Sequence, residues 1–183
     1  MKTLFNFNIM LLLTGLVFIN SACKETPKEE IEQVKTVEVV NEISDTDFKA
    51  LWEKIDLMWE KRAPELINNV YADNFTRISP GGKSTSGAEL VSEFNAINGA
   101  YPDMILNLDD YYISGNIVVV NWSADGTFSG ELIGVKGNEK PFKAISGITV
   151  LTIEDGKVVK DDSSWNALEI FLQTGYKITS QEE

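Results

Sequence analysis

The side chains best placed for acid–base chemistry are two consecutive aspartates, Asp161 and Asp162, in the predicted strand Lys157–Trp165. Successive side chains of a strand point to opposite faces, so one of the two can face the interior while the other faces solvent. A carboxylate that is desolvated by apolar neighbours has a raised pKa and can act as a general acid or base. Charged groups are rarely buried without a partner, so we favour a second interpretation, in which both are solvated charges beside Lys160. Asp125, near the end of its own predicted strand, is a weaker candidate with the same alternative.

Aromatic side chains form a second group of candidates, for ligand binding rather than for proton transfer. Core packing is the ordinary role of any single aromatic residue. Four tryptophans are many for a domain of this size, however, and an apolar ligand cavity would use them. Arg77 can be a buried cation that orients a ligand carboxylate or carbonyl, although an exposed strand position is the interpretation we favour. The residues expected to line a ligand pocket are Trp52, Tyr71, Arg77, Trp122 and Trp165.

The composition argues against several other kinds of site. The chain has no histidine, which removes the usual acid–base group near neutral pH and the commonest metal ligand. With a single cysteine, zinc binding and Cys–His chemistry are not expected either. A net charge of −12 argues against nucleic acid, because phosphate binding needs clustered Lys and Arg. We therefore expect no metal, no cofactor and no nucleic-acid partner.

The N-terminus has the layout of a secretory signal. Lys2 precedes the apolar stretch Ile9–Ile19, which is shorter than the roughly 20 residues that cross a bilayer. Small residues and then Cys23 follow, which resembles a bacterial lipobox, where the thiol is acylated and the peptide is cut just before it. Asn20 departs from that motif, which usually has leucine there. The alternative is plain secretion with cleavage after Ala22. We expect an exported protein of the cell envelope, anchored to a bacterial membrane through acylated Cys23.

The chain divides into a signal peptide (1–22), a flexible tether (23–43), one domain (44–178) and a short tail (179–183). Residues 24–35 are mostly charged and cannot bury enough apolar surface to offset the entropy of ordering. The segment of about 135 residues that follows the tether suits a single hydrophobic core.

Helices are predicted in the first half of this domain and strands in the second half. Ser44 is a plausible N-cap for a helix, a second short helix begins at Pro64 with Tyr71 on its inner side, and a capping pattern at Ser86 starts a third. Between the last two lies a short strand over 75–78. The later strands, rich in Val, Ile, Thr and aromatic residues and joined by two Gly-containing turns, cover 104–113, 117–128, 142–153 and 157–165. This order predicts an α+β domain in which three N-terminal helices pack on one face of a curved, mostly antiparallel sheet.

Two stretches of the domain carry recognisable motifs. The first is Gly126–Gly134, with its spaced glycines, and the second runs from Ile148 to Val159 and continues through Trp165 to the Leu-Gln-Thr-Gly run that ends at Gly175. In their order and spacing, these stretches resemble the SnoaL-like polyketide cyclase group of the nuclear transport factor 2-like superfamily. The resemblance covers roughly residues 48–176. It implies a cone-shaped domain, with a bent sheet wrapped on helices and an apolar pocket inside.

The resemblance also implies where a cyclase would hold its acid–base pair. Counted from the turn at Gly156, the aspartate position of the group falls on Ser163 and the histidine position on Thr149. Neither residue carries the required group, because a serine hydroxyl needs a base beside it. Asp161 lies two residues before Ser163 and points to the same face of a regular strand, so it is the substitute that the sequence offers.

Three functions are compatible with these observations. The one we favour is binding of a small, largely apolar molecule in the cone, without catalysis. The second is an acid–base enzyme of the cyclase, isomerase or dehydratase type that uses Asp161. The third is a structural module for dimerisation or partner binding. A homodimer through the sheet is compatible with the resemblance, since the superfamily often dimerises in this way.

Overall fold

The computed structural model describes residues 42–177 and residue 179. The predicted signal peptide, Cys23 and nearly all of the tether lie outside these residues. Within the described part, no helix has both the length and the apolar character needed to cross a membrane.

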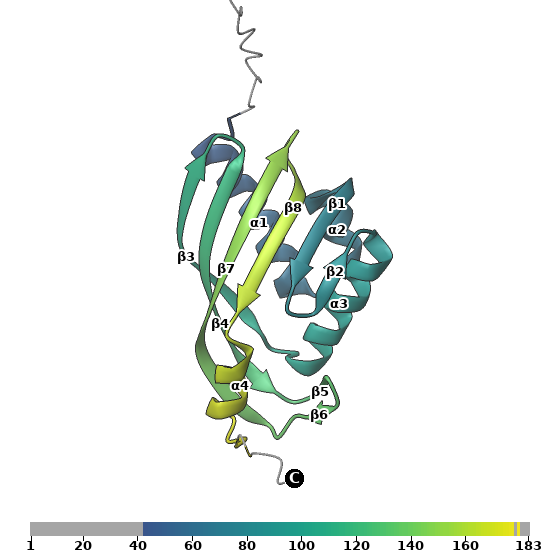
Figure 1. Ribbon diagram of the computed structural model, residues 1–183, viewed down its shortest axis with the longest axis vertical. Helices are drawn as coiled ribbons and strands as arrows, with labels where there is room; N and C mark the ends of the chain where they lie inside the picture. Colours follow the sequence, from purple (N-terminus) through teal and green to yellow (C-terminus); the bar gives the residue numbers. More distant parts are fainter. Residues whose placement is uncertain (1–41, 178, 180–183) are drawn as a thin grey trace, which may run out of the picture. The chain divides into compact units, whose positions relative to one another are not determined.

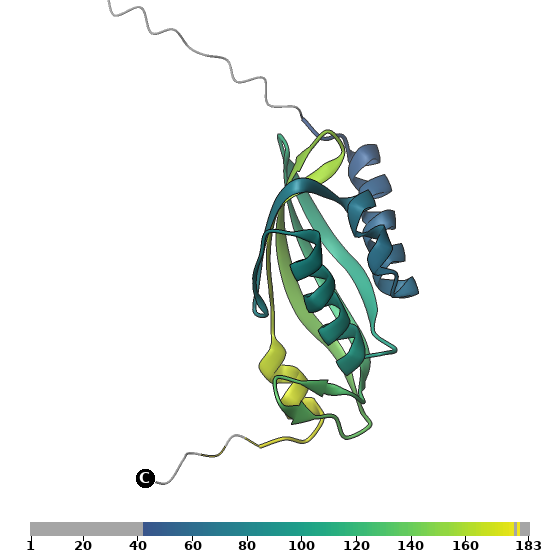
Figure 2. The ribbon, with the colours of Figure 1, turned by 90° about the vertical axis from the view of Figure 1, so that its right-hand side faces the viewer.

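Helices cover one side of the sheet (Figure 2). The Ser44 hydroxyl accepts a hydrogen bond from the Asp47 amide and caps the first helix, and the Ser86 hydroxyl caps the third in the same way through the Glu89 amide. Both caps were predicted. The helices are α1 (Asp45–Lys61), the 3-10 turn η1 (Pro64–Leu66), α2 (Ile67–Val70), α3 (Gly87–Ala100) and α4 (Ala167–Gln173).

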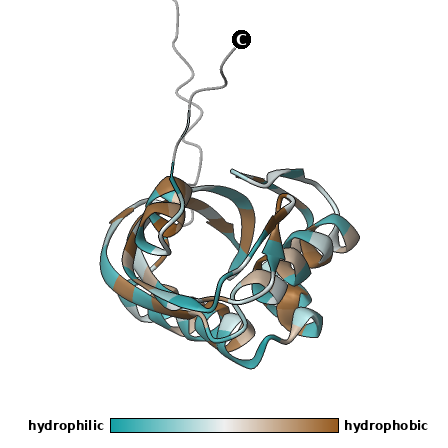
Figure 3. Ribbon diagram, turned by 90° about the horizontal axis from the view of Figure 1, so that it is seen from below, coloured by the Kyte–Doolittle hydropathy of each residue, from teal (hydrophilic) through white to brown (hydrophobic). Residues whose placement is uncertain are grey.

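Six strands form one curved sheet in the order β2-β1-β8-β7-β4-β3 (Figure 1). Neighbours are antiparallel except β1 and β8, which run parallel. Seen from below, the sheet bends around an interior that the helices close on the remaining side (Figure 3). The strands of this sheet are β1 (Tyr71–Ser79), β2 (Gly82–Ser84), β3 (Ile105–Ser114), β4 (Ile117–Phe128), β7 (Lys140–Glu154) and β8 (Lys157–Trp165).

The predicted α+β cone is confirmed, with two local corrections. Tyr71 is not on the inner side of the second helix, because that helix ends at Val70 and Tyr71 starts β1, opposite Val158 of β8. Strand β1 is accordingly longer than the predicted strand 75–78. The small hairpin of β5 (Glu131–Leu132) and β6 (Val135–Lys136) and helix α4 were not predicted; they lie together at one end of the sheet (Figure 1).

Two clusters of buried side chains make up the core. In the first, α1, α2 and α3 pack against the middle of the sheet around Phe48, Met58 and Phe94. In the second, the ends of α3, β4 and β7 pack with α4 around Phe128 and Phe142. Trp59 and Trp122 contact both clusters, and the cavity described next lies among these residues.

Candidate functional site

A cavity of about 90 Å³, partly open to solvent, lies inside the cone. Its walls come from the helices α1, α3 and α4 and from the strands β1, β3, β4, β5, β7 and β8, and most of the lining is apolar. The structure brings the predicted pocket-lining residues, the two family acid–base positions and Asp161 to this one cavity: Trp52, Tyr71, Arg77, Trp122, Thr149, Asp161, Ser163 and Trp165. Whether they bind a ligand stays a prediction.

Asp161 is buried, with only 2% of its surface exposed. The favoured interpretation of Asp161 as a solvated charge beside Lys160 is therefore wrong. The reason is a partner that the sequence did not reveal: Arg77 lies opposite Asp161 in the parallel β1–β8 pair and neutralises it. Asp162, one residue on, points to the other face, where its carboxylate pairs with the Lys160 amine at 2.5 Å.

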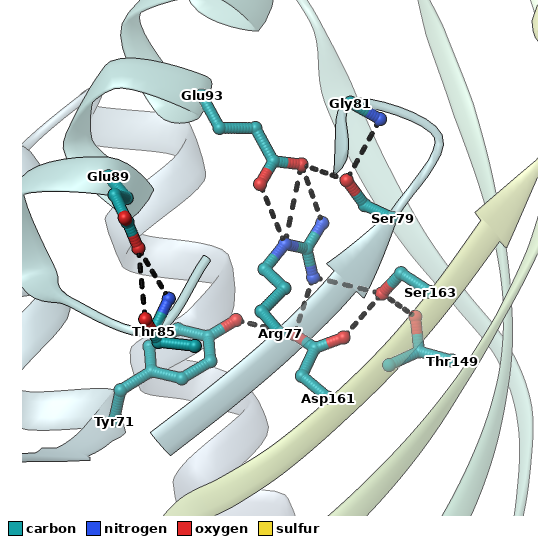
Figure 4. Close-up of polar contacts among 10 residues, drawn as sticks. All are labelled: Tyr71, Arg77, Ser79, Gly81, Thr85, Glu89, Glu93, Thr149, Asp161 and Ser163. Carbon is teal, nitrogen blue, oxygen red and sulfur yellow. Dashed lines mark hydrogen bonds and ion pairs between the residues drawn. The ribbon is translucent and has the colours of Figure 1, made fainter. Parts of the chain in front are cut away.

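Arg77 is buried too, which corrects the exposed position that we favoured for it. Its Nη1 donates to Asp161 at 2.5 Å and to the Ser163 hydroxyl at 2.9 Å (Figure 4). Its Nε donates to Oε2 of Glu93 at 3.3 Å, and its Nη2 donates to Oε1 of the same carboxylate at 3.4 Å. Four of the five guanidinium N–H groups are thus used inside the cluster. Arg77 is held by carboxylates of the protein and is not a free cation for a ligand carboxylate.

Glu93 is the residue of this cluster that sequence reasoning missed. It lies on α3, and besides Arg77 it accepts a hydrogen bond from the Ser79 hydroxyl at 2.5 Å. A signal was present: Glu93 follows Leu90 by three residues and precedes Ile97 by four, so it interrupts the apolar stripe of the helix. A carboxylate in such a stripe needs a buried cation, and the buried cation is Arg77.

Tyr71 donates its hydroxyl hydrogen bond to Asp161 at 2.6 Å. Burial, and then the negative charge of Asp161, raise the pKa of Tyr71 well above its usual value, so the phenol stays protonated. Burial disfavours the charged form of Arg77, but the charges of Asp161 and Glu93 outweigh this and raise the pKa of the guanidinium further. Both groups are therefore permanent donors to the carboxylate.

A directed chain of hydrogen bonds also ends on Asp161 (Figure 4). The Ser163 hydroxyl donates to Asp161 at 2.6 Å, so its single proton is used. Thr149, opposite Ser163 in the β7–β8 pair, must then donate to the Ser163 oxygen, 2.8 Å away. The Trp122 indole in turn donates to the Thr149 oxygen at 2.9 Å. The two positions at which the resemblance places acid–base groups thus carry hydroxyls in one chain, in which Thr149 donates to Ser163 and Ser163 donates to Asp161.

Asp125 does not belong to the site. Its carboxylate accepts the backbone N–H of Ala144 at 2.9 Å, beside an irregularity in the β4–β7 pairing. This contact provides a structural reason for the aspartate, because Ala144 has a left-handed backbone with φ of 51°.

Gly147 allows two tryptophans to approach each other in the cavity wall. It pairs with Trp122 of β4 on one side and with Trp165 of β8 on the other, and the two indole rings lie 6.4 Å apart. A Cβ atom on Gly147 would lie 2.2 Å from the Trp122 ring, closer than any real contact. The absence of a side chain at Gly147 therefore leaves the space that the Trp122 ring occupies.

We expect Gly147→Ala to displace Trp122 and to lower the free energy of unfolding by about 1–3 kcal/mol, the usual cost of overpacking. Near-UV circular dichroism should change as the indole moves away from Thr149, and urea unfolding measures the stability. The matched control is Gly99→Ala on α3, where an added Cβ meets nothing within 4 Å. Gly99→Ala should be neutral or stabilising by up to about 1 kcal/mol. Equal effects of the two changes would show that Gly147 has no special packing role.

The fold and its cavity define an α+β cone of the kind that several solved structures share. TsrD from Streptomyces laurentii superposes with a TM-score of 0.67 at 18% identity, over 74% of this chain and 100% of that one. AclR from Streptomyces galilaeus gives 0.64 at 20% identity, over 75% of this chain and 87% of that one. IdmH from Streptomyces antibioticus superposes with a TM-score of 0.61 at 18% identity, over 69% of this chain and 97% of that one. At these identities the similarity establishes the fold alone.

The family follows from a sequence model. Residues 49–174, well over half of the chain, match the model of the SnoaL-like polyketide cyclases. The chain belongs to this family, as the resemblance of its glycine and strand motifs predicted. Among curated proteins, no sequence matches it significantly.

Proposed function

We propose that this protein binds a small, largely apolar molecule in the cone and does not transform it. The observation that carries the proposal is the state of Asp161, the carboxylate in the cavity. One of its oxygens accepts hydrogen bonds from Tyr71 and Arg77, and the other accepts one from Ser163. An oxygen that is already engaged by fixed donors is poorly placed to take a proton from a ligand. The largely apolar walls suit binding instead.

An acid–base enzyme is the second candidate, because Asp161 does line the cavity. For such a reaction a ligand group would have to displace Ser163 or Tyr71 from the carboxylate. The third candidate, a module whose cavity is filled by its own side chains, receives no support from a cavity that is partly open.

The proposal includes a location. The charged N-terminus, the short apolar stretch and Cys23 support export and acylation, which would hold the cone at a bacterial membrane. A single acyl chain gives only marginal membrane binding, so a stable anchor requires more than one chain on this residue.

Mass spectrometry of the full-length protein, purified from its native membrane, tests both the proposed ligand binding and the proposed membrane anchor. Under native conditions we expect a small molecule bound to the intact protein, and under denaturing conditions a mass increase from acyl chains that maps to Cys23. Cys23→Ser should lose the acyl chains and keep the bound molecule. Recovery of the molecule in chemically altered form after incubation would instead support the enzyme, and a mature protein without acyl chains would refute the anchor.

A further inference from the structure

The charges buried beside the cavity do not cancel. The cluster holds one cation, Arg77, and two carboxylates, Asp161 and Glu93. The exposed fractions of their side chains are 8%, 3% and 11%, so water screens this cluster little. Tyr71 is neutral, and Arg77 and Asp161 are the only charged groups among the described residues that line the cavity. These two lining charges cancel each other. The net charge of −1 belongs to the whole cluster and comes from Glu93, which contacts Arg77 but is not part of the lining.

The hydrogen-bonding groups around Asp161 have the same bias. The protons of Trp122, Thr149, Ser163 and Tyr71 are all donated within the protein. What this polar part of the wall can still offer a ligand is lone pairs on the oxygens of Tyr71, Thr149 and Asp161. The polar part of the wall around Asp161 therefore favours a ligand group that carries positive charge or donates hydrogen bonds.

Aromatic rings complete the surroundings. Trp52 and Trp59 of α1, Trp122 of β4 and Trp165 of β8 line the same cavity, together with Tyr101. The faces of such rings attract cations, and indole does so most strongly. The volume of about 90 Å³ is below the ~150 Å³ of a cavity that holds benzene, so the enclosed part of a ligand is a small group. A longer apolar part can extend through the open side.

We infer that the ligand of this cavity is a small apolar organic cation of the tertiary or quaternary ammonium class. The ammonium group lies among the tryptophans, and the excess charge of the Arg77–Asp161–Glu93 cluster stabilises it. This inference rests on the proposed binding function and specifies its ligand class.

Isothermal titration calorimetry of the full chain with three probes of matched shape tests the inference. The probes are choline, the neutral alcohol in which a tert-butyl group replaces its trimethylammonium group, and the anion tert-butylacetate. We expect choline to bind about tenfold more tightly than the alcohol, and tert-butylacetate more weakly than either. Equal affinity for choline and the alcohol would overturn the cation inference and leave apolar binding in place. No binding of any probe would overturn both.

Two variants, each of which removes one negative charge, test whether the preference for the cation comes from the buried cluster. Glu93→Gln makes the buried cluster neutral, so the preference for choline over the alcohol should fall about fivefold. Asp162→Asn removes a carboxylate on the outer face of β8 and should leave the preference unchanged. Equal losses in the two variants would show that the overall charge of the protein, rather than this cluster, attracts the cation. If Glu93→Gln does not fold, as circular dichroism would show, the three probes on the unaltered chain decide the inference alone.

Discussion

Arg77→Met should lower the free energy of unfolding by about 3–5 kcal/mol, the usual cost of removing one partner of a buried ion pair. Arg77 is 6% exposed, and its removal leaves Asp161 and Glu93 buried together without a cation. The variant loses the attraction of Arg77 to both carboxylates, and the two carboxylates then repel each other in surroundings of low dielectric constant. Urea unfolding followed by tryptophan fluorescence measures it.

The matched control is Lys160→Met, which breaks the exposed ion pair with Asp162 on the outer face of β8. Exposed pairs contribute about 0–1 kcal/mol, so this variant should be nearly as stable as the unaltered protein. If Arg77→Met cost no more than Lys160→Met, the buried cluster would have no special energetic role.

The loss in Arg77→Met should also depend on pH. In this variant, protonation of a buried carboxylate removes an uncompensated charge, so the folded state takes up protons more readily than the unfolded chain. Stability then rises as the pH falls. The gap between variant and unaltered protein should therefore narrow from about pH 8 to about pH 5. A gap that stays constant over this range would contradict buried, uncompensated carboxylates.

The strands of this domain could be predicted from local sequence because their signals are local. Runs of β-branched and aromatic residues set the extent of β4 and β8, and turns at Gly115 and Gly156 join their hairpins. The bounds of β4 and β8 agree with prediction for this reason. Tyr71 was misassigned because a helix of four residues carries little periodicity, and a partner strand far along the chain decided its conformation.

The site could be predicted only in part, for the opposite reason. The lining tryptophans stand out by number and residue type. The pairing of Arg77 with Asp161 depends on the parallel contact of β1 and β8, and these residues are 84 positions apart in the sequence. No periodicity encodes such a contact. Without knowledge of the β1–β8 contact, a single charged residue in a strand is predicted to be exposed, and Arg77 and Asp161 were both predicted in this way.

The charge cluster also changes the meaning of the substituted acid–base positions. Thr149 and Ser163 form a chain of donors, in which Thr149 donates to Ser163 and Ser163 donates to Asp161. A carboxylate that is surrounded in this way is held in one orientation by its donors. The same geometry that weakens the case for catalysis thus supports the proposed binding of a cation.

Phe128→Ala should lower the free energy of unfolding by about 3–5 kcal/mol, the range found when a large aromatic side chain is removed from a core. Phe128 is fully buried at the end of β4, in the core cluster that also contains Tyr101, Phe142 and Ile170. Its ring centre lies 5.4 Å from that of Tyr101 and 5.8 Å from that of Phe171 of α4. The alanine variant leaves a void in this core cluster. Three residues of the cluster, Tyr101, Phe142 and Ile170, also line the ligand cavity, so the void adjoins the cavity wall.

The control for this change is Leu172→Ala on α4, where the leucine is 45% exposed and its truncation should cost within about 0.5 kcal/mol. Urea unfolding compares the two variants at equal protein concentration. Similar losses would show that α4 and the end of β4 do not form one packed unit. A large loss confined to Phe128→Ala would show that the end of the cone formed by the hairpin and α4, neither of which was predicted from sequence, stabilises the wall of the cavity. The shape of the ligand site would then depend on this second core cluster as much as on the three N-terminal helices.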